Sequence, residues 1–258
     1  MGTPGQEIFT TADGLAVPAV TEEGMREVDR IAVEDTGPAL FQMMENAGRN
    51  LALQAIDMMG PAWASSKVVV LAGTGGNGGG GICAARHLAN RGADVTLSVT
   101  RVEGLGEVPA YQRHVFLGTQ GREASVGELP ADGVGLVIDA LLGYSLKGAP
   151  RGAALEAIRW ANACAAPKLS LDVPSGVNST TGDTPGEYIK PAATLTLALP
   201  KTGLKAHLTG DLILADIGIP VACYQKMGLK YQSPFGAAYR VPLRQSDSAQ
   251  GERAAISR

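Results

Sequence analysis

Aromatic residues and charged residues are both scarce in this chain, and this scarcity excludes some classes of protein. Of 258 residues, 5% are aromatic and 18% are charged, and 22 Lys and Arg are nearly balanced by 25 Asp and Glu. Proteins that bind nucleic acid usually carry an excess of basic residues on one face. The near balance of charge therefore argues against a nucleic-acid partner.

The sequence also lacks a long apolar run and a recognisable export signal. No stretch approaches the roughly 20 consecutive apolar residues that a helix needs to cross a bilayer. The first residues combine neither the basic start nor the apolar segment of a secretion signal. We therefore expect a cytoplasmic protein that has no membrane partner.

Cysteine is rare as well, since the chain has only Cys83, Cys164 and Cys223, each in an apolar context. An odd number of cysteines at wide spacing is not typical of a disulfide framework or a zinc site. The three histidines lie in separate segments. We predict buried thiols in a reducing compartment and no metal chemistry through thiolate or imidazole.

Glycine, by contrast, is abundant, with 34 of 258 residues against a usual share of about 7%. The excess is concentrated in residues 73–81, directly after the short apolar run of residues 68–72. Such a β-branched run is typical of a strand that is covered on both faces. We predict a strand, a glycine turn over residues 73–81, and a helix that begins at Ile82.

The rest of the chain shows the same alternation of helical spacing and short apolar runs. Thr21 is expected to cap a first helix, and Glu22 and Glu23 favour its first turn. Alternating strands and helices predict an α/β fold with a mostly parallel sheet. Further helices are expected over residues 40–55 and 155–163, and further strands over residues 95–100, 136–141, 169–173, 194–199 and 212–217.

The chain shows no internal linker strong enough to divide it. We predict a single α/β domain over residues 19–240, preceded by a flexible N-terminal leader over residues 1–18 and followed by a disordered tail over residues 241–258.

Three glycines of the loop, Gly73, Gly75 and Gly78, fit the G-x-G-x-x-G pattern of dinucleotide-binding loops. Glycine lets a phosphate approach the main chain, and a helix start attracts negative charge. Taken alone the match is weak, so a turn without a ligand and an ordinary NAD(P) oxidoreductase both stay open. The Lys-Ser/Thr pair of a P-loop is missing, which argues against ATP hydrolysis.

Two carboxylates follow predicted strands at the point where each strand ends. Asp139 ends one strand and Asp172 ends the next. Ligands of open parallel sheets bind beyond the carboxyl ends of the strands. We therefore expect Asp139, Asp172 and the glycine loop to meet at one crevice.

These segments carry a resemblance to a known family. Gly76-Asn77-Gly78-Gly79-Gly80-Gly81, Val137-Ile-Asp139-Ala-Leu-Leu-Gly143 and Asp172-Val-Pro-Ser175-Gly176 are similar, in that order, to the motifs of the NAD(P)HX epimerase family, also called the YjeF N-terminal domain. Further similarity lies in residues 44–49, 199–204 and 215–220.

The resemblance implies a Rossmann-like three-layer α/β/α sandwich, frequently a homodimer, that interconverts the R and S forms of NADH and NADPH hydrated at C6. A separate NAD(P)H-hydrate dehydratase would then act on the S form. It also implies one potassium ion per subunit, held by Asn77, Asp139 and Ser175, and a catalytic Asp172 that faces the damaged ring. Residues implied to bind the substrate are Gly76, Asn77, Gly78, Gly79, Gly80, Gly143, Tyr144, Ser145, Leu146, Lys147, Gly148, Ala149 and Asp172.

The chain departs from the family pattern at two positions. Gly80 stands where the family has an acid, and Gly76 stands where it has an Asn. A lost general acid or base typically lowers a rate by about 10²–10⁴. An impaired epimerase and a silent paralogue that binds a nucleotide-like ligand or a protein partner are therefore both open. For Lys201, which matches a Pro-Lys position of the family, a solvated charge at a strand end is an equal alternative.

Overall fold

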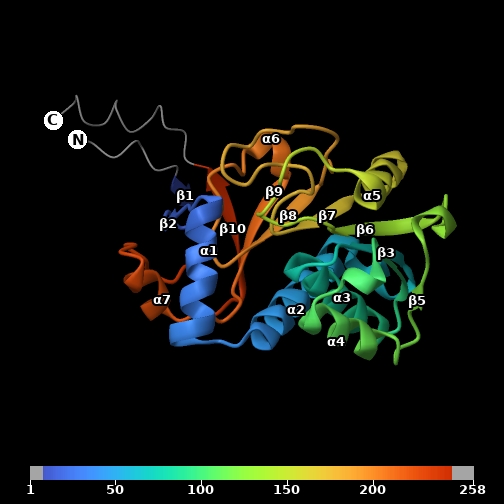
Figure 1. Ribbon diagram of the computed structural model, residues 1–258, viewed down its shortest axis with the longest axis horizontal. Helices are drawn as coiled ribbons and strands as arrows, with labels where there is room; N and C mark the ends of the chain where they lie inside the picture. Colours follow the sequence, from blue (N-terminus) through green and yellow to red (C-terminus); the bar gives the residue numbers. More distant parts are fainter. Residues whose placement is uncertain (1–7, 246–258) are drawn as a thin grey trace.

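A single ten-stranded sheet runs through the computed structural model, which describes residues 8–245. Strands β3 to β9 are parallel to one another, and β1, β2 and β10 add antiparallel pairs at one end. The spatial order is β2-β1-β10-β9-β8-β7-β6-β3-β4-β5 (Figure 1). The strands are β1 (Ile8–Thr10), β2 (Ala16–Pro18), β3 (Lys67–Ala72), β4 (Asp94–Val99), β5 (Arg122–Glu123), β6 (Val134–Ala140), β7 (Lys168–Leu171), β8 (Ala193–Leu197), β9 (Asp211–Ala215) and β10 (Arg240–Gln245).

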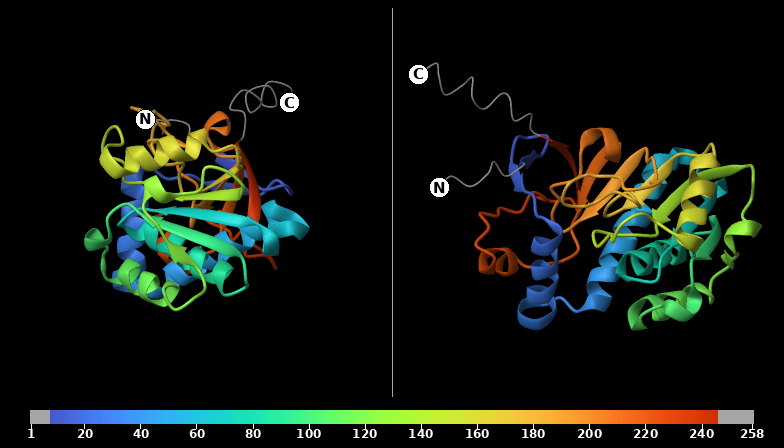
Figure 2. Two further views of the ribbon diagram at one scale, coloured as in Figure 1. Left: turned by 90° about the vertical axis from the view of Figure 1, so that its right-hand side faces the viewer. Right: turned by 45° about the horizontal axis from the view of Figure 1, so that its top comes forward.

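Helices cover both faces of this sheet, which gives the three-layer α/β/α arrangement expected from the sequence. Figures 1 and 2 show α2, α3 and α4 on one face and α5 on the other, with α1 and α7 near the β10 end. Within residues 8–245, no helix is both long and apolar enough to cross a membrane. The helices are α1 (Glu22–Ile31), α2 (Leu40–Met59), α3 (Gly76–Ala89), α4 (Glu107–Phe116), α5 (Gly152–Ala163), α6 (Ala206–Thr209) and α7 (Val221–Lys226), with short helical turns at Ala32–Thr36, Gly60–Ser65, Val102–Gly104 and Val126–Glu128.

The apolar run of β3 is buried on both sides, as its sequence predicts. Val70 belongs to the core cluster that contains Leu88 of α3, and its neighbour Val69 belongs to the cluster that contains Ile158 of α5. Successive side chains of a strand point to opposite faces, so a strand between two helical layers must be apolar throughout. The predicted cap of α1 is also confirmed, because the Thr21 hydroxyl accepts a hydrogen bond from the Gly24 amide at 3.2 Å.

The N-terminal segment differs from the flexible leader that we predicted. Residues 8–18 form the β1–β2 hairpin, in which the side chains of Phe9 and Val17 are fully buried. They pack in one cluster with Leu243 of β10, a strand that extends past the predicted domain end at residue 240. Strands of three residues are too short to show a recognisable alternation, so they could not be predicted from the sequence. The rest of the predicted leader and tail, residues 1–7 and 246–258, lies outside the described residues.

The glycine segment is also different, since α3 begins at Gly76 and not at Ile82. None of the glycines in residues 73–81 has a positive φ. All except Gly75 and Gly76 are needed instead for close packing of the helix start. A Cβ atom at Gly78 would lie 1.9 Å from the carbonyl oxygen of Gly73, and one at Gly81 would lie 2.4 Å from the Cβ of Ala140 on β6. The glycines therefore let α3 approach the sheet more closely than any other residue would allow.

Replacing Gly81 by Ala should test this explanation of the glycine segment. The added methyl group overlaps the backbone-linked Cβ of Ala140, which has no free rotation to avoid it. We expect the free energy of unfolding to fall by about 1–3 kcal/mol, as is typical of overpacked cores, in urea titrations. Gly76→Ala is the matched control, because no atom lies within 4 Å of a Cβ at that position. Equal stability of the two variants would contradict the packing argument.

Candidate active site

A cavity of about 590 Å³ opens at the carboxyl edge of the sheet, where the loops after β3, β6 and β7 meet α1 and α2. Most of its wall is apolar, with Met25, Met43, Met44, Leu141 and Leu142 among the lining side chains. A mostly apolar cavity with a few convergent polar groups is typical of a small-molecule site. The polar side chains on the wall are Asp29, Thr74, Asn77, Thr100, Tyr144, Ser145, Asp172 and Lys201.

The structure brings about half of the implied substrate-binding residues to this cavity. Gly78 and Gly79 pack against Gly73 and Met44 inside the protein, and Lys147 and Gly148 are exposed on the loop beyond the cavity. The residues on the wall are Gly76, Asn77, Gly80, Gly143, Tyr144, Ser145 and Asp172, and those away from it are Gly78, Gly79, Leu146, Lys147, Gly148 and Ala149.

Asp139 lies directly beneath the cavity wall and is fully buried. The hydroxyl of Ser170 donates a hydrogen bond to its carboxylate at 2.7 Å, and the amide of Ser175 donates another at 2.9 Å. The hydroxyl of Ser175 donates to the second carboxylate oxygen. Burial raises the pKa of Asp139 above its usual value, and these hydrogen bonds act in the opposite direction. The hydrogen bonds between Ser175 and Asp139 thus hold the loop after β7 against the end of β6.

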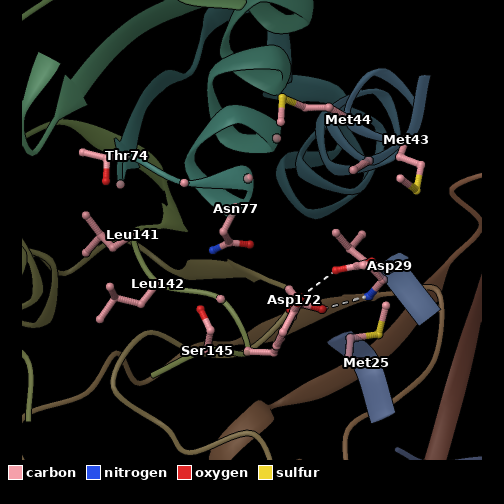
Figure 3. A pocket seen from close by; sticks show the side chains of 18 of the residues that line it. Met25, Asp29, Met43, Met44, Thr74, Asn77, Leu141, Leu142, Ser145 and Asp172 are labelled. Atoms are coloured by element: carbon pink, nitrogen blue, oxygen red, sulfur yellow. Dashed lines mark hydrogen bonds between the residues drawn. The ribbon is translucent and has the colours of Figure 1, made fainter. Parts of the chain in front are cut away.

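Asn77 projects from the first turn of α3 toward the cavity, as Figure 3 shows. Both polar atoms of its side-chain amide are buried and have no hydrogen-bond partner within residues 8–245. A buried amide without hydrogen-bond partners destabilises the folded protein. Such a group is typical of a position that binds a ligand or an ion. Asn77 contacts the same short segment as Ser175. A Cβ on Gly143 would lie 3.2 Å from the Asn77 Cβ, and the amide of Leu142 donates to the Ser175 hydroxyl at 2.9 Å.

Asp172 forms a buried ion pair with Lys201 on the cavity wall. The Lys201 side chain is fully buried, and its ammonium group also donates to the carbonyl oxygen of Leu197 at 2.9 Å. The alternative of a solvated Lys201 is therefore wrong. Asp172 has a φ of 68°, a left-handed conformation that costs a residue with a side chain roughly 1–3 kcal/mol. Strained residues of this kind are concentrated at functional sites.

Asp29 is a site residue that the sequence did not reveal. It lies on α1, one turn after Met25, and both side chains reach the cavity wall (Figure 3). The hydroxyl of Tyr144 donates a hydrogen bond to its carboxylate at 2.6 Å. Burial raises the pKa of Asp29, and the hydrogen bond from Tyr144 opposes that shift. The spacing of Met25 and Asp29 places them on one face of the helix, but nothing in the sequence shows where that face docks.

Comparison with known proteins identifies the family of this chain. Residues 40–203 match the family described as YjeF-related protein N-terminus. The chain belongs to this family. Over 240 residues it is 52% identical to the NAD(P)H-hydrate epimerase of Dehalogenimonas lykanthroporepellens, covering 93% of this chain and 98% of that protein. Over 218 residues it is 33% identical to the NAD(P)H-hydrate epimerase of Rhodopirellula baltica, covering 80% of this chain and 87% of that protein.

One further relative and one solved structure extend the comparison. The bifunctional NAD(P)H-hydrate repair enzyme Nnr of Hyperthermus butylicus is 38% identical over 232 residues, which are 86% of this chain but only 42% of that protein. The crystal structure of the yeast protein ynu0 superposes with a TM-score of 0.74 at 22% identity, covering 88% of this chain and 100% of the other. This second likeness supports the fold alone.

Gly80 is one of the two positions, with Gly76, at which the chain departs from the pattern expected for the YjeF family. A Cβ at Gly80 would lie 2.8 Å from a methyl carbon of Leu171 and 3.8 Å from the Cβ of Ala47. Gly80 also lines the cavity. An acid at this position would require Leu171 to move, so the local packing of this chain is adapted to glycine.

One group of potential metal ligands lies elsewhere, between α2 and α3. The ligand atoms of Glu45, Cys83 and His87 lie within 4.8 Å of one another. Arg86 already supplies positive charge there, since its guanidinium donates to the Glu45 carboxylate and to the Cys83 sulfur. Burial raises the pKa of Cys83 to about 12, so the thiol is protonated at neutral pH. Cys83 is buried as predicted, but its surroundings are polar and not apolar.

Proposed function

We propose that this protein is an NAD(P)H-hydrate epimerase, which interconverts the R and S forms of NADH and NADPH hydrated at C6 of the nicotinamide ring. The observation that carries the proposal is the Asp172–Lys201 pair, a charge-compensated carboxylate on the wall of a mostly apolar cavity. Two relatives that bear this name match 93% and 80% of the chain. A silent paralogue would not need a buried, strained carboxylate at this point.

The start of α3 suits the phosphates of such a nucleotide. The first amides of a helix have no partner within the helix, and its N-terminus attracts negative charge. No atom lies within 4 Å of a Cβ at Gly75 or Gly76, so a phosphate group can approach the main chain there. The apolar side chains of Met25, Met43 and Leu142 offer contacts for the nicotinamide ring.

The carboxylate of Asp172 fits the chemistry at C6. The hydroxyl group on C6 is attached to a carbon next to nitrogen, and such a carbon loses and regains hydroxyl through an iminium state. A carboxylate can move the proton that this exchange requires, and general acid or base assistance contributes about 10²–10⁴ in rate. The ammonium group of Lys201 compensates the negative charge of this carboxylate and fixes its position.

We further propose that potassium binds at Asn77, Asp139 and Ser175. The unpartnered amide of Asn77 fits a ligand, and amide, carboxylate and hydroxyl oxygens suit a hard cation. When bound, the ion would offset the negative charge of the buried Asp139. A homodimer, a cytoplasmic location and cooperation with a separate dehydratase remain parts of this proposal. The bifunctional repair enzymes among the relatives support the last part.

The proposed activity can be tested with purified protein and chromatographically resolved R and S forms of hydrated NADPH, with potassium present. We expect the protein to accelerate interconversion in both directions until the ratio reaches that of the uncatalysed reaction. Interconversion at the uncatalysed rate would contradict the proposal. If such a protein still bound hydrated NADPH, the silent paralogue would be the better description.

Replacing Asn77 by Ala should remove the response to potassium. Loss of a direct oxygen ligand should weaken ion affinity by at least the 10–100-fold that is typical of lost supporting groups. Potassium, compared with sodium, should raise the melting temperature and the rate of the wild type but not of the variant. Ser145→Ala, at an exposed position of the same wall, is the control and should keep the response. A variant that still responds would exclude Asn77 as a ligand.

A further inference from the structure

We propose that Asp29 is a second catalytic carboxylate, which exchanges a proton with the C6 hydroxyl group on the face of the ring opposite to Asp172. This inference rests on the proposed epimerase function. Asp29 belongs to none of the motifs that carry the family resemblance, because it is supplied by α1, far from the strand ends.

The position of Asp29 allows direct contact with a ligand in the cavity. Its carboxylate lines the same cavity as Asp172, and Tyr144 donates a hydrogen bond to one of its two oxygens, Oδ2. The other oxygen, Oδ1, has no hydrogen-bond partner within residues 8–245. It is also not fully buried, because the buried atoms without a partner do not include it. Oδ1 is thus open to a group in the cavity, and Tyr144 fixes the orientation of the carboxylate.

Asp29 and Asp172 have different electrostatic surroundings. Asp172 is paired with the buried ammonium of Lys201, whereas no cation within residues 8–245 is in hydrogen-bond contact with Asp29. Arg26, on the same helix, is bound to Glu22 at 2.7 Å.

Burial raises the pKa of Asp29, the Tyr144 hydroxyl and the charges of Lys201 and Arg26 lower it, and the negative charge of Asp172 raises it. Cys223 and Tyr224 of α7 are further titratable groups near Asp29, and burial raises the pKa of each. Two carboxyl groups whose surroundings differ in this way are suited to opposite roles, one as acid and one as base.

These roles give a balanced reaction at C6. The acid proton of Asp29 passes to the C6 hydroxyl oxygen, the C6–O bond breaks with its electron pair leaving on water, and the nitrogen lone pair forms the N1=C6 double bond. Water then adds to C6 from the other face, the π electrons return to nitrogen, and the released proton passes to Asp172. Exchange of protons with solvent restores both carboxyl groups. The reverse reaction uses the same groups with exchanged roles.

Two groups are required because the hydroxyl leaves one face of the ring and water returns to the other. A single carboxylate beside the ring cannot reach both faces without rotation of the substrate. Reactions that invert a carbon bearing oxygen commonly place two carboxyl groups on opposite sides for this reason. Asp29 is supplied by α1 and Asp172 by the loop after β7, so the two carboxylates reach the cavity from different elements, and we expect the ring to bind between them.

Asp29→Asn tests the inference directly. We expect kcat for the interconversion of hydrated NADPH to fall about 10²-fold or more, with KM little changed, because the ring contacts remain. Glu27→Gln is the matched control, since it removes an exposed carboxylate from the same helix and should keep wild-type kcat. An inactive wild type would overturn the proposed function. An active wild type whose Asp29→Asn variant keeps the same kcat would overturn this inference alone.

Tyr144→Phe gives a second test that does not depend on the stability of the Asp29 variant. The wild-type rate should fall as pH rises through the pKa of Asp29, because the acid form is lost. Removing the Tyr144 hydroxyl takes away a donor that stabilises the ionised form, so the pKa of Asp29 rises further. The alkaline fall in kcat should therefore move to higher pH in this variant. An unchanged pH profile would mean that Tyr144 and Asp29 have only a structural role.

Discussion

Replacing Asp172 by Asn should lower kcat for the interconversion of R and S hydrated NADPH by about 10²–10⁴. Asn keeps the size of the side chain but can neither accept nor return the proton that the C6 hydroxyl group requires. KM should change less, because the apolar wall and the start of α3 are untouched. Initial rates over a range of substrate concentrations separate the two parameters.

The matched control for this variant is Asp183→Asn. Asp183 is an exposed carboxylate further along the same loop, where it accepts a hydrogen bond from Thr181 at 2.7 Å. This control should keep the wild-type kcat. Circular dichroism of both variants distinguishes a catalytic loss from unfolding. A folded Asp172→Asn protein with the wild-type kcat would remove Asp172 from the chemistry and leave the cavity without its main acid–base group.

Replacing Lys201 by Met should lower the free energy of unfolding by about 3–5 kcal/mol, the usual effect of removing one partner of a buried ion pair. Asp172 is only 4% exposed, so its carboxylate would stay in a dry environment without a compensating charge. The carbonyl oxygen of Leu197 would also lose one of its two donors and keep the Leu199 amide. Met is unbranched and only one atom shorter than Lys, and urea titrations at neutral pH measure the difference.

Two companion variants make this result specific. Lys226→Met breaks an exposed ion pair with Asp35 and should change stability little, because solvent screens such a pair. The double variant Asp172→Asn with Lys201→Met removes both buried charges and should recover much of the lost stability. If Lys201→Met alone were as stable as the wild type, the pair could not be the buried ionic contact described above.

Much of the fold could be predicted because its signals are local. The run of residues 68–72 predicted β3, and the spacing of apolar residues predicted α2, because each pattern reports the surroundings of a single element. The β1–β2 hairpin escaped prediction. Its three-residue strands are stabilised by β10, more than 200 residues away, and neither strand is long enough to show a pattern by itself.

The sequence predicted only those residues of the candidate site that lie at the carboxyl ends of the strands. Parallel strands end at a common edge, so Asp139 and Asp172 could be expected near each other and near Asn77. The structure places Asn77 and Asp172 on one cavity, with Asp139 directly beneath its wall. The burial of Lys201 could not be predicted, because the sequence shows a charge after a strand but not the layer that covers it.

The sequence by itself determined most of the parallel strands, the helices α1, α2 and α5, the two carboxylates at strand ends and the resemblance to the YjeF family. Only the tertiary structure decided that α1 brings Asp29 to the cavity, that Tyr144 binds it, and that the glycines serve the packing of α3 against Ala140. The physical reason is that periodicity and strand ends are properties of neighbouring residues. The docking of one element on another depends on the free energy of burying both surfaces together, which no single segment contains.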